Sequence, residues 1–192
     1  WIALRWRVLG NPDEHALACN AHAVFKKLDI ALAPVTAVDL EDRGYDSRFL
    51  STDVATPWLN SAHWADAVQV NGSHLTPYTH FSICMSKSRG LARFVAWNID
   101  GGRLRRLSRS GIDFVLDSRV GEEFQHGNEL YRHNNLDRGH LARRADLTWG
   151  SLAEANLANR ESFRYTNIAP QHQAFNQSSR GGLWGRLENA VF

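Results

Sequence analysis

The chain has 192 residues, of which 43% are hydrophobic and 22% are charged. This length and composition suit one ordinary globular domain with an apolar core, and they exclude a largely disordered chain. No apolar run approaches the roughly 18 residues that span a bilayer, and no cleavable signal pattern is visible. We therefore expect no membrane association and leave the compartment open, with the cytoplasm slightly favoured.

The formal net charge is only +2, so any basic surface must come from where the charges lie. Basic residues greatly outnumber acids between Ser86 and Ser110, where Asp100 is the single acid. The basic residues there are Lys87, Arg89, Arg93, Arg103, Arg105, Arg106 and Arg109. This stretch could hold a phosphate backbone, or it could be a solvated face.

The two cysteines, Cys19 and Cys84, lie far apart and have no metal-binding spacing, so neither a disulfide framework nor a zinc site is indicated. We expect Cys84 to be a small buried residue. The chain also lacks the GxSxG, GxxxxGK[ST], GxGxxG and HExxH patterns of other enzyme classes.

Near the amino terminus, residues 11–14 read Asn-Pro-Asp-Glu, which is typical of a helix start. Apolar residues then recur on one helical face at Leu17, Ala21, Val24 and Leu28. We expect residues 1–43 to form an amino-terminal helical segment, the tail of an upstream domain.

From Thr79 the apolar residues recur at every second position, where Phe81, Ile83 and Met85 alternate with small residues. A second apolar run follows from Leu91 to Ile99, which predicts a strand pair around a turn at residues 87–90. Residues 103–107 alternate arginine with leucine, which predicts a third extended segment in the same mixed sheet.

Further along, residues 153–160 predict a short helix or a loop. Residues 163–168 look extended, and we expect Pro170 to end that segment. From Phe175 to Phe192 the pattern is helical apart from Gly181 and Gly182.

The most informative motif is Asp137-Arg138-Gly139-His140. It is followed by the segment from Phe163 to Gln171, by Asn176, and by a run containing Leu183, Trp184, Leu187 and Glu188. In this order and spacing the chain resembles the DNA/RNA non-specific endonuclease family, the ββα-metal nucleases. The resemblance runs from about Gly44 to the last residue. It implies an α+β fold with a mixed, mainly antiparallel sheet, a ββα-metal finger, flanking helices and a nuclease domain over residues 44–192.

The activity that the resemblance implies is metal-dependent cleavage of phosphodiester bonds in DNA and RNA without sequence preference. A histidine with a pKa of about 6.5 is mostly neutral near pH 7 and can accept a proton from water. The family's general base matches His140, although a histidine at this place could instead close a turn. Asp137 and Arg138 would support the histidine-bearing turn and the phosphate or metal surroundings.

The resemblance assigns the metal ligand to Asn176 and the metal to Mg²⁺, with Mn²⁺ as a substitute. Asn176 could alternatively be a helix-capping amide. Glu188 matches the acid that holds metal-bound water. The interval between these two residues is wider than in the simplest family members, so we expect a loop or an extra turn to absorb the insertion.

Two polar residues, Asn167 and Gln171, match positions that orient the metal asparagine or contact substrate, although either could satisfy backbone groups near Pro170. For the arginine that stabilises transition-state charge we choose Arg109, with Arg106 close behind. A catalytically decayed or regulated nucleic-acid-binding effector is the alternative. Expected partners are DNA and RNA, an upstream regulatory domain or an inhibitor, and a second copy in a homodimer.

Overall fold

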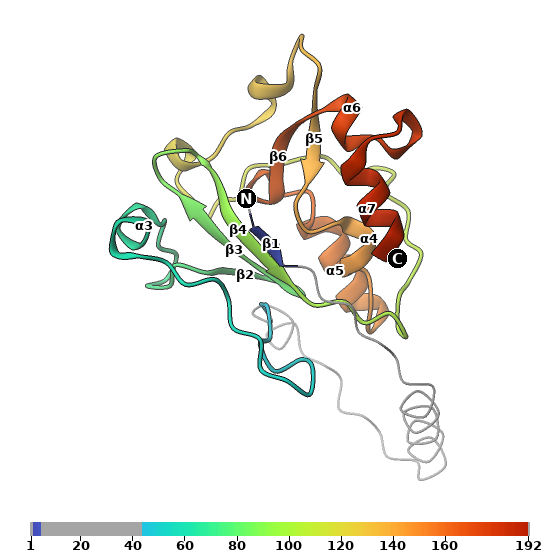
Figure 1. The fold of residues 1–192 in the computed structure, drawn as a ribbon, viewed down its shortest axis with the longest axis horizontal. Coiled ribbons are helices and arrows are strands. Elements are labelled where there is room, and N and C mark those ends of the chain that lie inside the picture. The colour runs from blue at the N-terminus through green and yellow to red at the C-terminus, as the bar shows by residue number, and fades with distance from the viewer. Residues whose placement is uncertain (1, 5–43, 192) are drawn as a thin grey trace.

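The computed structural model describes residues 2–4 and 44–191. The helix predicted from Asn11 lies outside the described residues. A four-stranded sheet has the order β1-β4-β3-β2, and a separate two-stranded ribbon pairs β5 with β6. The ribbon lies between the sheet and the carboxy-terminal helices (Figure 1). This arrangement confirms the predicted α+β class.

The sheet is built around the hairpin of β3 (Phe81–Ser86) and β4 (Leu91–Trp97). These antiparallel strands confirm the predicted strand pair, and Cys84 is fully buried within it. The strand β2 (Thr76–Tyr78) adds antiparallel to β3, whereas β1 (Ile2–Leu4) adds parallel to β4. The sheet is therefore mixed and mainly antiparallel, as predicted.

The extended segment predicted at residues 103–107 is not a strand of this sheet. Leu104 makes only an isolated bridge to Trp149, and the Arg105 N–H donates to the Thr148 carbonyl at 2.6 Å. The hydroxyl of Thr148 donates back to the Arg105 carbonyl at 2.9 Å. These contacts hold the segment against Thr148, which directly follows the short helix α4 (Arg144–Leu147).

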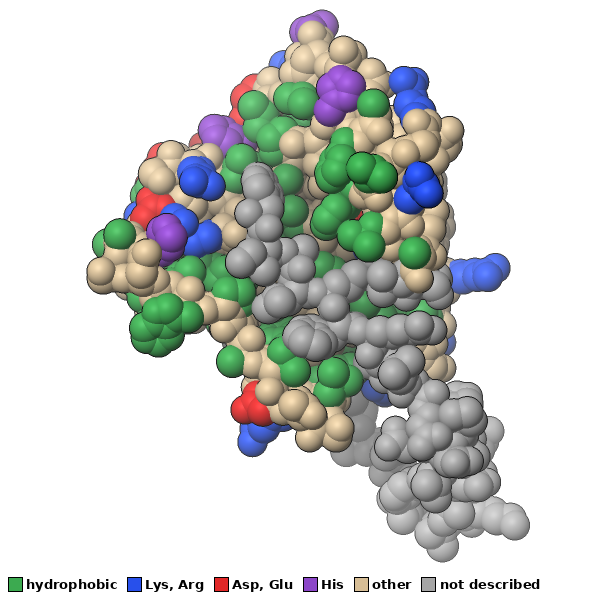
Figure 2. Space-filling model, viewed as in Figure 1, with side chains coloured by type: hydrophobic (Ala, Val, Ile, Leu, Met, Phe, Trp, Pro, Cys, Tyr) green, Lys and Arg blue, Asp and Glu red, His purple; other side chains and the backbone are tan. Residues whose placement is uncertain are grey.

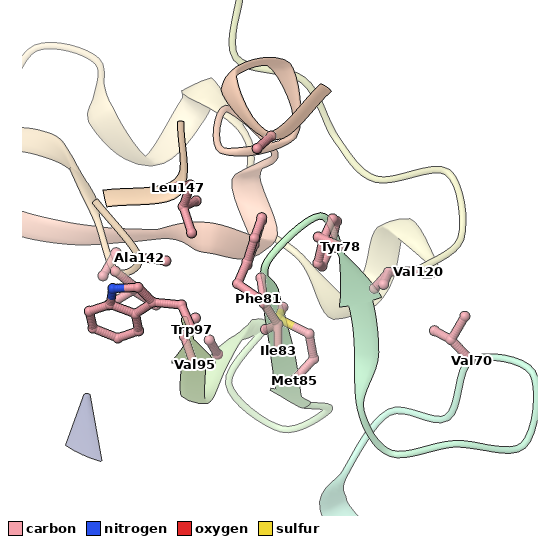
Figure 3. Close-up of a cluster of buried hydrophobic side chains, with 14 of the residues drawn as sticks. Val70, Tyr78, Phe81, Ile83, Met85, Val95, Trp97, Val120, Ala142 and Leu147 are labelled. Atoms are coloured by element: carbon pink, nitrogen blue, oxygen red, sulfur yellow. The ribbon is translucent and has the colours of Figure 1, made fainter. Parts of the chain in front are cut away.

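The hydrophobic core lies where the sheet meets the ribbon and the helices behind it (Figure 3). Tyr78 and Phe81 stack with ring centroids 4.6 Å apart. Trp97 and Leu147 are also almost fully buried and join the sheet to α4 (Arg144–Leu147). Ala169 of the ribbon belongs to the same buried cluster, so the core joins the ribbon to the sheet.

The carboxy-terminal half contains the ribbon strands β5 (Leu136–His140) and β6 (Ile168–His172) and the helix α5 (Leu152–Glu161), which begins with a capping box. The last elements are α6 (Gln173–Asn176), η4 (Ser178–Arg180) and α7 (Leu183–Val191). The region predicted as helical from Phe175 is indeed interrupted at its glycine pair, but it is also interrupted at Gln177, and residues 178–180 form a 3-10 helix. Short elements elsewhere are α3 (Ser61–Asp66), η1 (Glu122–Phe124) and η2 (Asn128–Tyr131).

Two expectations around Pro170 were wrong. Residues 165–167 form a 3-10 helix, η3 (Tyr165–Asn167), instead of a continuous extended segment. Pro170 does not end the strand that follows, because it lies inside β6 opposite Arg138. A two-stranded ribbon leaves alternate backbone N–H groups without a ladder partner, and a proline is tolerated at such a position.

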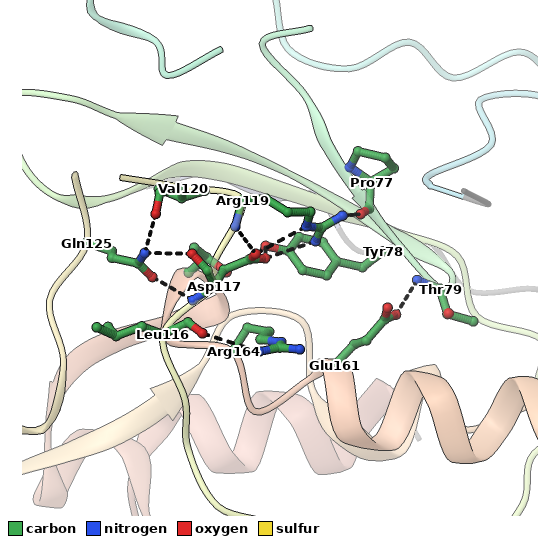
Figure 4. A network of polar contacts seen from close by, with 11 residues as sticks. Pro77, Tyr78, Thr79, Leu116, Asp117, Arg119, Val120, Gln125, Glu161 and Arg164 are labelled. Carbon is green, nitrogen blue, oxygen red and sulfur yellow. Dashed lines mark hydrogen bonds and ion pairs between the residues drawn. The ribbon is translucent and has the colours of Figure 1, made fainter. Parts of the chain in front are cut away.

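A buried polar network supports the back of η3 (Figure 4). The Tyr78 hydroxyl donates to Asp117 at 2.5 Å and lies 2.8 Å from the Thr166 hydroxyl. Arg119 forms an ion pair with Asp117 at 2.9 Å, and these contacts hold the pKa of Asp117 below its usual value despite burial. Because Thr166 precedes Asn167, the network anchors the segment that leads into β6.

Every helix in the described part of the chain is too short or too polar to span a bilayer.

Candidate active site

The ribbon brings the two motif segments side by side. Asp137 pairs with Gln171, Gly139 with Ala169 and His140 with Ile168. The helix α6 begins directly after β6, and its last residue is Asn176. Two antiparallel strands followed by a helix are the order that a ββα finger requires, so the finger is present as expected.

Asp137 ties the first motif to this helix. Its Oδ2 accepts hydrogen bonds from Asn176 Nδ2 at 3.0 Å and from Gln177 Nε2 at 2.8 Å. The amide nitrogen of Asn176 is therefore turned toward a carboxylate. This orientation leaves the Asn176 Oδ1 as the group that can coordinate a cation.

His140 lies at the end of β5 against the rings of Phe163 and Phe114, with centroids 5.2 and 5.7 Å away. Its Nε2 is buried and has no hydrogen-bond partner among the described residues. Burial, and then the nearby guanidinium groups of Arg109 and Arg144, lower the pKa of His140 to about 4. The imidazole is therefore neutral at pH 7 and can accept a proton.

An open cleft of about 550 Å³ surrounds His140. The cations that line it are Arg109, Arg138, Arg143 and Arg144, and the acids are Asp137 and Glu188. Asn176, Gln177, Ala145 and the rings of Phe114 and Phe163 complete the lining. With His140 neutral, the cleft carries an excess of positive charge, which attracts a polyanion.

Two of the arginines are positioned over aromatic rings. The Arg138 guanidinium lies 5.0 Å from the Phe114 centroid and also hydrogen bonds to Asn128 Oδ1. The Arg109 guanidinium lies 5.8 Å from the Phe163 centroid, which is the ring that His140 contacts. Arg106 is exposed and is not part of the cleft lining, so of the two arginines considered it is Arg109 that accompanies His140.

Glu188 reaches the same cleft from α7. The insertion after Asn176 is absorbed by η4 and by Gly181, which has a left-handed φ of 76°. Adding a Cβ to Gly185 would place it 2.6 Å from the Asn176 carbonyl oxygen, so α7 approaches the backbone of α6 closely. The long interval in the sequence therefore does not remove Glu188 from the site.

Asn167 lies in the interior and does not line the cleft. Its Oδ1 accepts from the Ala142 N–H at 2.9 Å, and its Nδ2 donates to the carbonyls of Ala142 and Ser162 at 3.0 Å. It thus fixes the backbone immediately after His140. Gln171 is also buried, beside Gly139, and its Oε1 has no partner among the described residues. The contacts of Asn167 are those of a residue that satisfies backbone groups, whereas the Gln171 side chain lies against Gly139, and neither residue lines the cleft.

The oxygen donors in the cleft suit a hard divalent cation. They are the Asn176 amide and the carboxylates of Asp137 and Glu188. Over residues 44–191, no three His, Cys, Asp or Glu side chains converge into a complete protein cage for a metal. A cation held by few protein oxygens, together with water and a substrate phosphate, is the kind that this donor set fits.

Sequence reasoning missed several cleft residues. Arg143 and Arg144 lie three and four residues after His140. Two adjacent arginines so close to the proposed base could have indicated that they line the cleft. Phe114 and Phe163 gave no such signal, because an isolated aromatic residue is indistinguishable from a core residue in the sequence. Gln177 next to Asn176 was visible but had no assigned role.

A second cavity, of about 420 Å³, is mainly apolar. It lies between β4 and β6 and is bordered by Phe175 and Trp184. Figure 2 shows hydrophobic side chains gathered over α6 and α7 on this face, where Phe175, Leu183 and Leu187 are exposed. It does not contain His140 or Asn176, so the polar cleft is the candidate for chemistry.

The comparisons with known proteins agree with this geometry. A sequence model of the DNA/RNA non-specific endonuclease family matches residues 59–192. The chain is 38% identical over 158 residues to uncharacterized protein y4fB of Sinorhizobium fredii (strain NBRC 101917 / NGR234), a match that covers 76% of this chain and 24% of the relative. It is 35% identical over 81 residues to the mitochondrial endonuclease G of Bos taurus, covering 42% of this chain and 24% of that protein.

Among solved structures, a chain in the crystal structure of the EndoG/EndoGI complex matches with a TM-score of 0.53 and 23% identity. The match covers 62% of this chain and 46% of that chain, and it supports the fold alone. This chain spans about a quarter of the length of the curated relatives that it matches.

Proposed function

Because the chain belongs to the DNA/RNA non-specific endonuclease family, we propose that it is a metal-dependent endonuclease that hydrolyses phosphodiester bonds in DNA and RNA without sequence preference. The observation that carries the proposal is a neutral histidine in a cleft that four arginines and the Asn176 amide also line.

His140 is the proposed general base. The side of its imidazole that lines the cleft would accept a proton from the water that attacks the phosphorus atom, and its lowered pKa keeps the ring neutral at neutral pH. Arg109 would stabilise negative charge on the phosphate oxygens as the bond order to the attacking oxygen increases. Arg138 would hold the phosphate from its place over the Phe114 ring.

Asn176 and Glu188 are the proposed metal-binding residues. Asn176 would offer its Oδ1, Glu188 would hold coordinated water, and Asp137 would keep the Asn176 amide turned the right way. A bound Mg²⁺, or Mn²⁺ in its place, would supply positive charge to the phosphate and leaving oxygens. Because the Asn176 amide is neutral, it cancels none of the metal's charge, whereas a carboxylate at the same position would cancel part of it.

The lack of sequence preference follows from the side chains that line the cleft. Guanidinium groups recognise phosphates, which every sequence shares, and phosphate contacts position a nucleic acid without reading its bases. The same reasoning extends the substrate from DNA to RNA. An inhibitor or regulatory domain and a homodimer are proposed partners, of which the inhibitor has a parallel in the inhibition of EndoG within the solved EndoG/EndoGI complex.

The test compares the purified wild-type protein with His140→Ala and Asn176→Ala. We expect both variants to lose cleavage of plasmid DNA while retaining DNA binding, measured by fluorescence anisotropy in Ca²⁺. Full cleavage by either variant would refute the assignment. Binding by the wild-type protein without cleavage under any divalent cation would instead support a decayed or regulated binding module.

A further inference from the structure

Arg143 makes a three-point contact with α7. Its guanidinium donates to the Glu188 carbonyl at 3.1 Å and to Asn189 Oδ1 at 3.0 Å. Its Nε also lies 3.9 Å from Glu188 Oε2. A guanidinium is a rigid planar group with several donors, so these contacts fix both the orientation of α7 and its distance from Arg143.

This contact has a specific task on α7. The first half of the helix is located by the close approach of Gly185 to Asn176. The second half, which carries Glu188, lies C-terminal to that contact and borders a small cavity that Leu141 and Arg143 also line. Arg143 is therefore placed to hold the half of the helix that brings Glu188 into the cleft.

Arg144, the next residue, contacts a different part of the structure, which lies next to Arg109 in the sequence. Its guanidinium donates to the Leu107 carbonyl at 3.0 Å and to Asn159 Oδ1 at 3.2 Å. Asn159 is 3% exposed, and its Nδ2 donates to the Ser108 carbonyl at 2.9 Å. The two consecutive carbonyls that precede Arg109 are thus tied to α4 and α5.

We propose that Arg143 and Arg144 are positioning residues that fix the two walls of the cleft independently. Arg143 sets the place of Glu188 on the metal side, and Arg144 sets the place of Arg109 on the phosphate side. Both residues lie at the start of α4. Asn167 holds the backbone of Ala142 just before them, so the positions of both walls are tied to the segment that carries His140. The proposal deepens the proposed nuclease function and rests on it.

The experiment uses lysine substitutions, which keep the charge but lose the forked geometry. Divalent-cation binding is measured by calorimetry with Mn²⁺ and no substrate, and cleavage is measured as kcat and KM. Arg143→Lys, and Asn189→Ala at an exposed position, should each weaken Mn²⁺ binding about tenfold, as loss of an outer metal-site contact does. Arg144→Lys and Asn159→Ser should leave Mn²⁺ binding unchanged and lower kcat about tenfold or more, with KM less affected.

Arg186→Gln is the matched control, because it removes an exposed arginine from the same helix and should change neither quantity. Thermal unfolding confirms that each variant is folded. Wild-type Mn²⁺ affinity in both Arg143→Lys and Asn189→Ala would overturn the metal-side half, and a loss of Mn²⁺ affinity in Arg144→Lys would overturn the independence of the walls. A wild-type protein that binds Mn²⁺ but cleaves nothing would refute the nuclease function, whereas the Mn²⁺ measurements need no turnover.

Discussion

Replacing Gly139 by alanine places a methyl group where the side chain of Gln171 already lies. The added Cβ would be 2.6 Å from Gln171 Cγ and closer still to Cδ and Oε1. Gln171 is 9% exposed and lies on the paired strand β6, so relief requires either displacement of its packed side chain or a shift of the β5–β6 ribbon. Overpacking of this kind costs about 1–3 kcal/mol of unfolding free energy. The motif therefore needs glycine for close packing between the two strands.

The assay is thermal unfolding of Gly139→Ala, Gln171→Ala and the double variant, with DNA cleavage measured in parallel. A cost of about 1–3 kcal/mol should lower Tm by roughly 2–12 °C in a domain of this size. Gln171→Ala removes the atoms that clash, so the double variant should recover much of that loss. Cleavage by Gly139→Ala should also fall, because His140 is the next residue. Wild-type stability of Gly139→Ala, or strictly additive effects in the double variant, would refute the steric reasoning.

Three further predictions follow from the same geometry. With the His140 pKa at about 4, cleavage should stay near its maximum from pH 7 to about pH 5 and fall toward pH 4, and a half-maximum near pH 6.5 would contradict the buried environment. Asn167→Ala should lower the unfolding free energy by about 2–5 kcal/mol in urea titrations, because it leaves buried backbone groups of Ala142 and Ser162 unpaired. A loss under about 1 kcal/mol would contradict a structural role for these Asn167 hydrogen bonds. Glu188→Gln should raise the Mg²⁺ concentration for half-maximal cleavage about tenfold or more, and an unchanged requirement would remove Glu188 from the metal site.

The His140 shift also has a consequence for stability. Its folded pKa of about 4 lies below the unfolded value of about 6.5, so the unfolded state takes up the proton first as the pH falls. This group therefore contributes stability that is present above about pH 6.5 and is lost progressively down to about pH 4. Circular dichroism at each pH separates that loss from the effect on cleavage.

The ββα finger was predictable from the resemblance, because the order of the motif segments is the order of β5, β6 and α6. The bounds of β6 were not, because the extended segment expected at residues 163–168 lies before most of that strand. The hairpin of β3 and β4 was likewise readable from its apolar alternation. The extended segment at residues 103–107 was not, because alternation of arginine with leucine imitates a half-buried strand, while Leu104 in fact bridges Trp149.

The parts of the site that escaped prediction depend on contacts between distant segments. Nothing in the sequence near Arg144 indicates that it reaches Leu107, and nothing near Arg143 indicates that it reaches Asn189. Asn167 was expected to orient the metal asparagine, to contact substrate or to satisfy backbone groups near Pro170, and only its contacts with Ala142 reveal a structural task behind His140. Pro170 inside a strand likewise needs the two-stranded context to be understood.

The nuclease assignment is best tested by cleavage of supercoiled plasmid and of a structured RNA by the purified chain, with Mg²⁺ and with excess EDTA, beside His140→Ala. We expect degradation of both substrates that requires the metal and His140. Cleavage that persists in EDTA, or that is unchanged in His140→Ala, would contradict the proposed site.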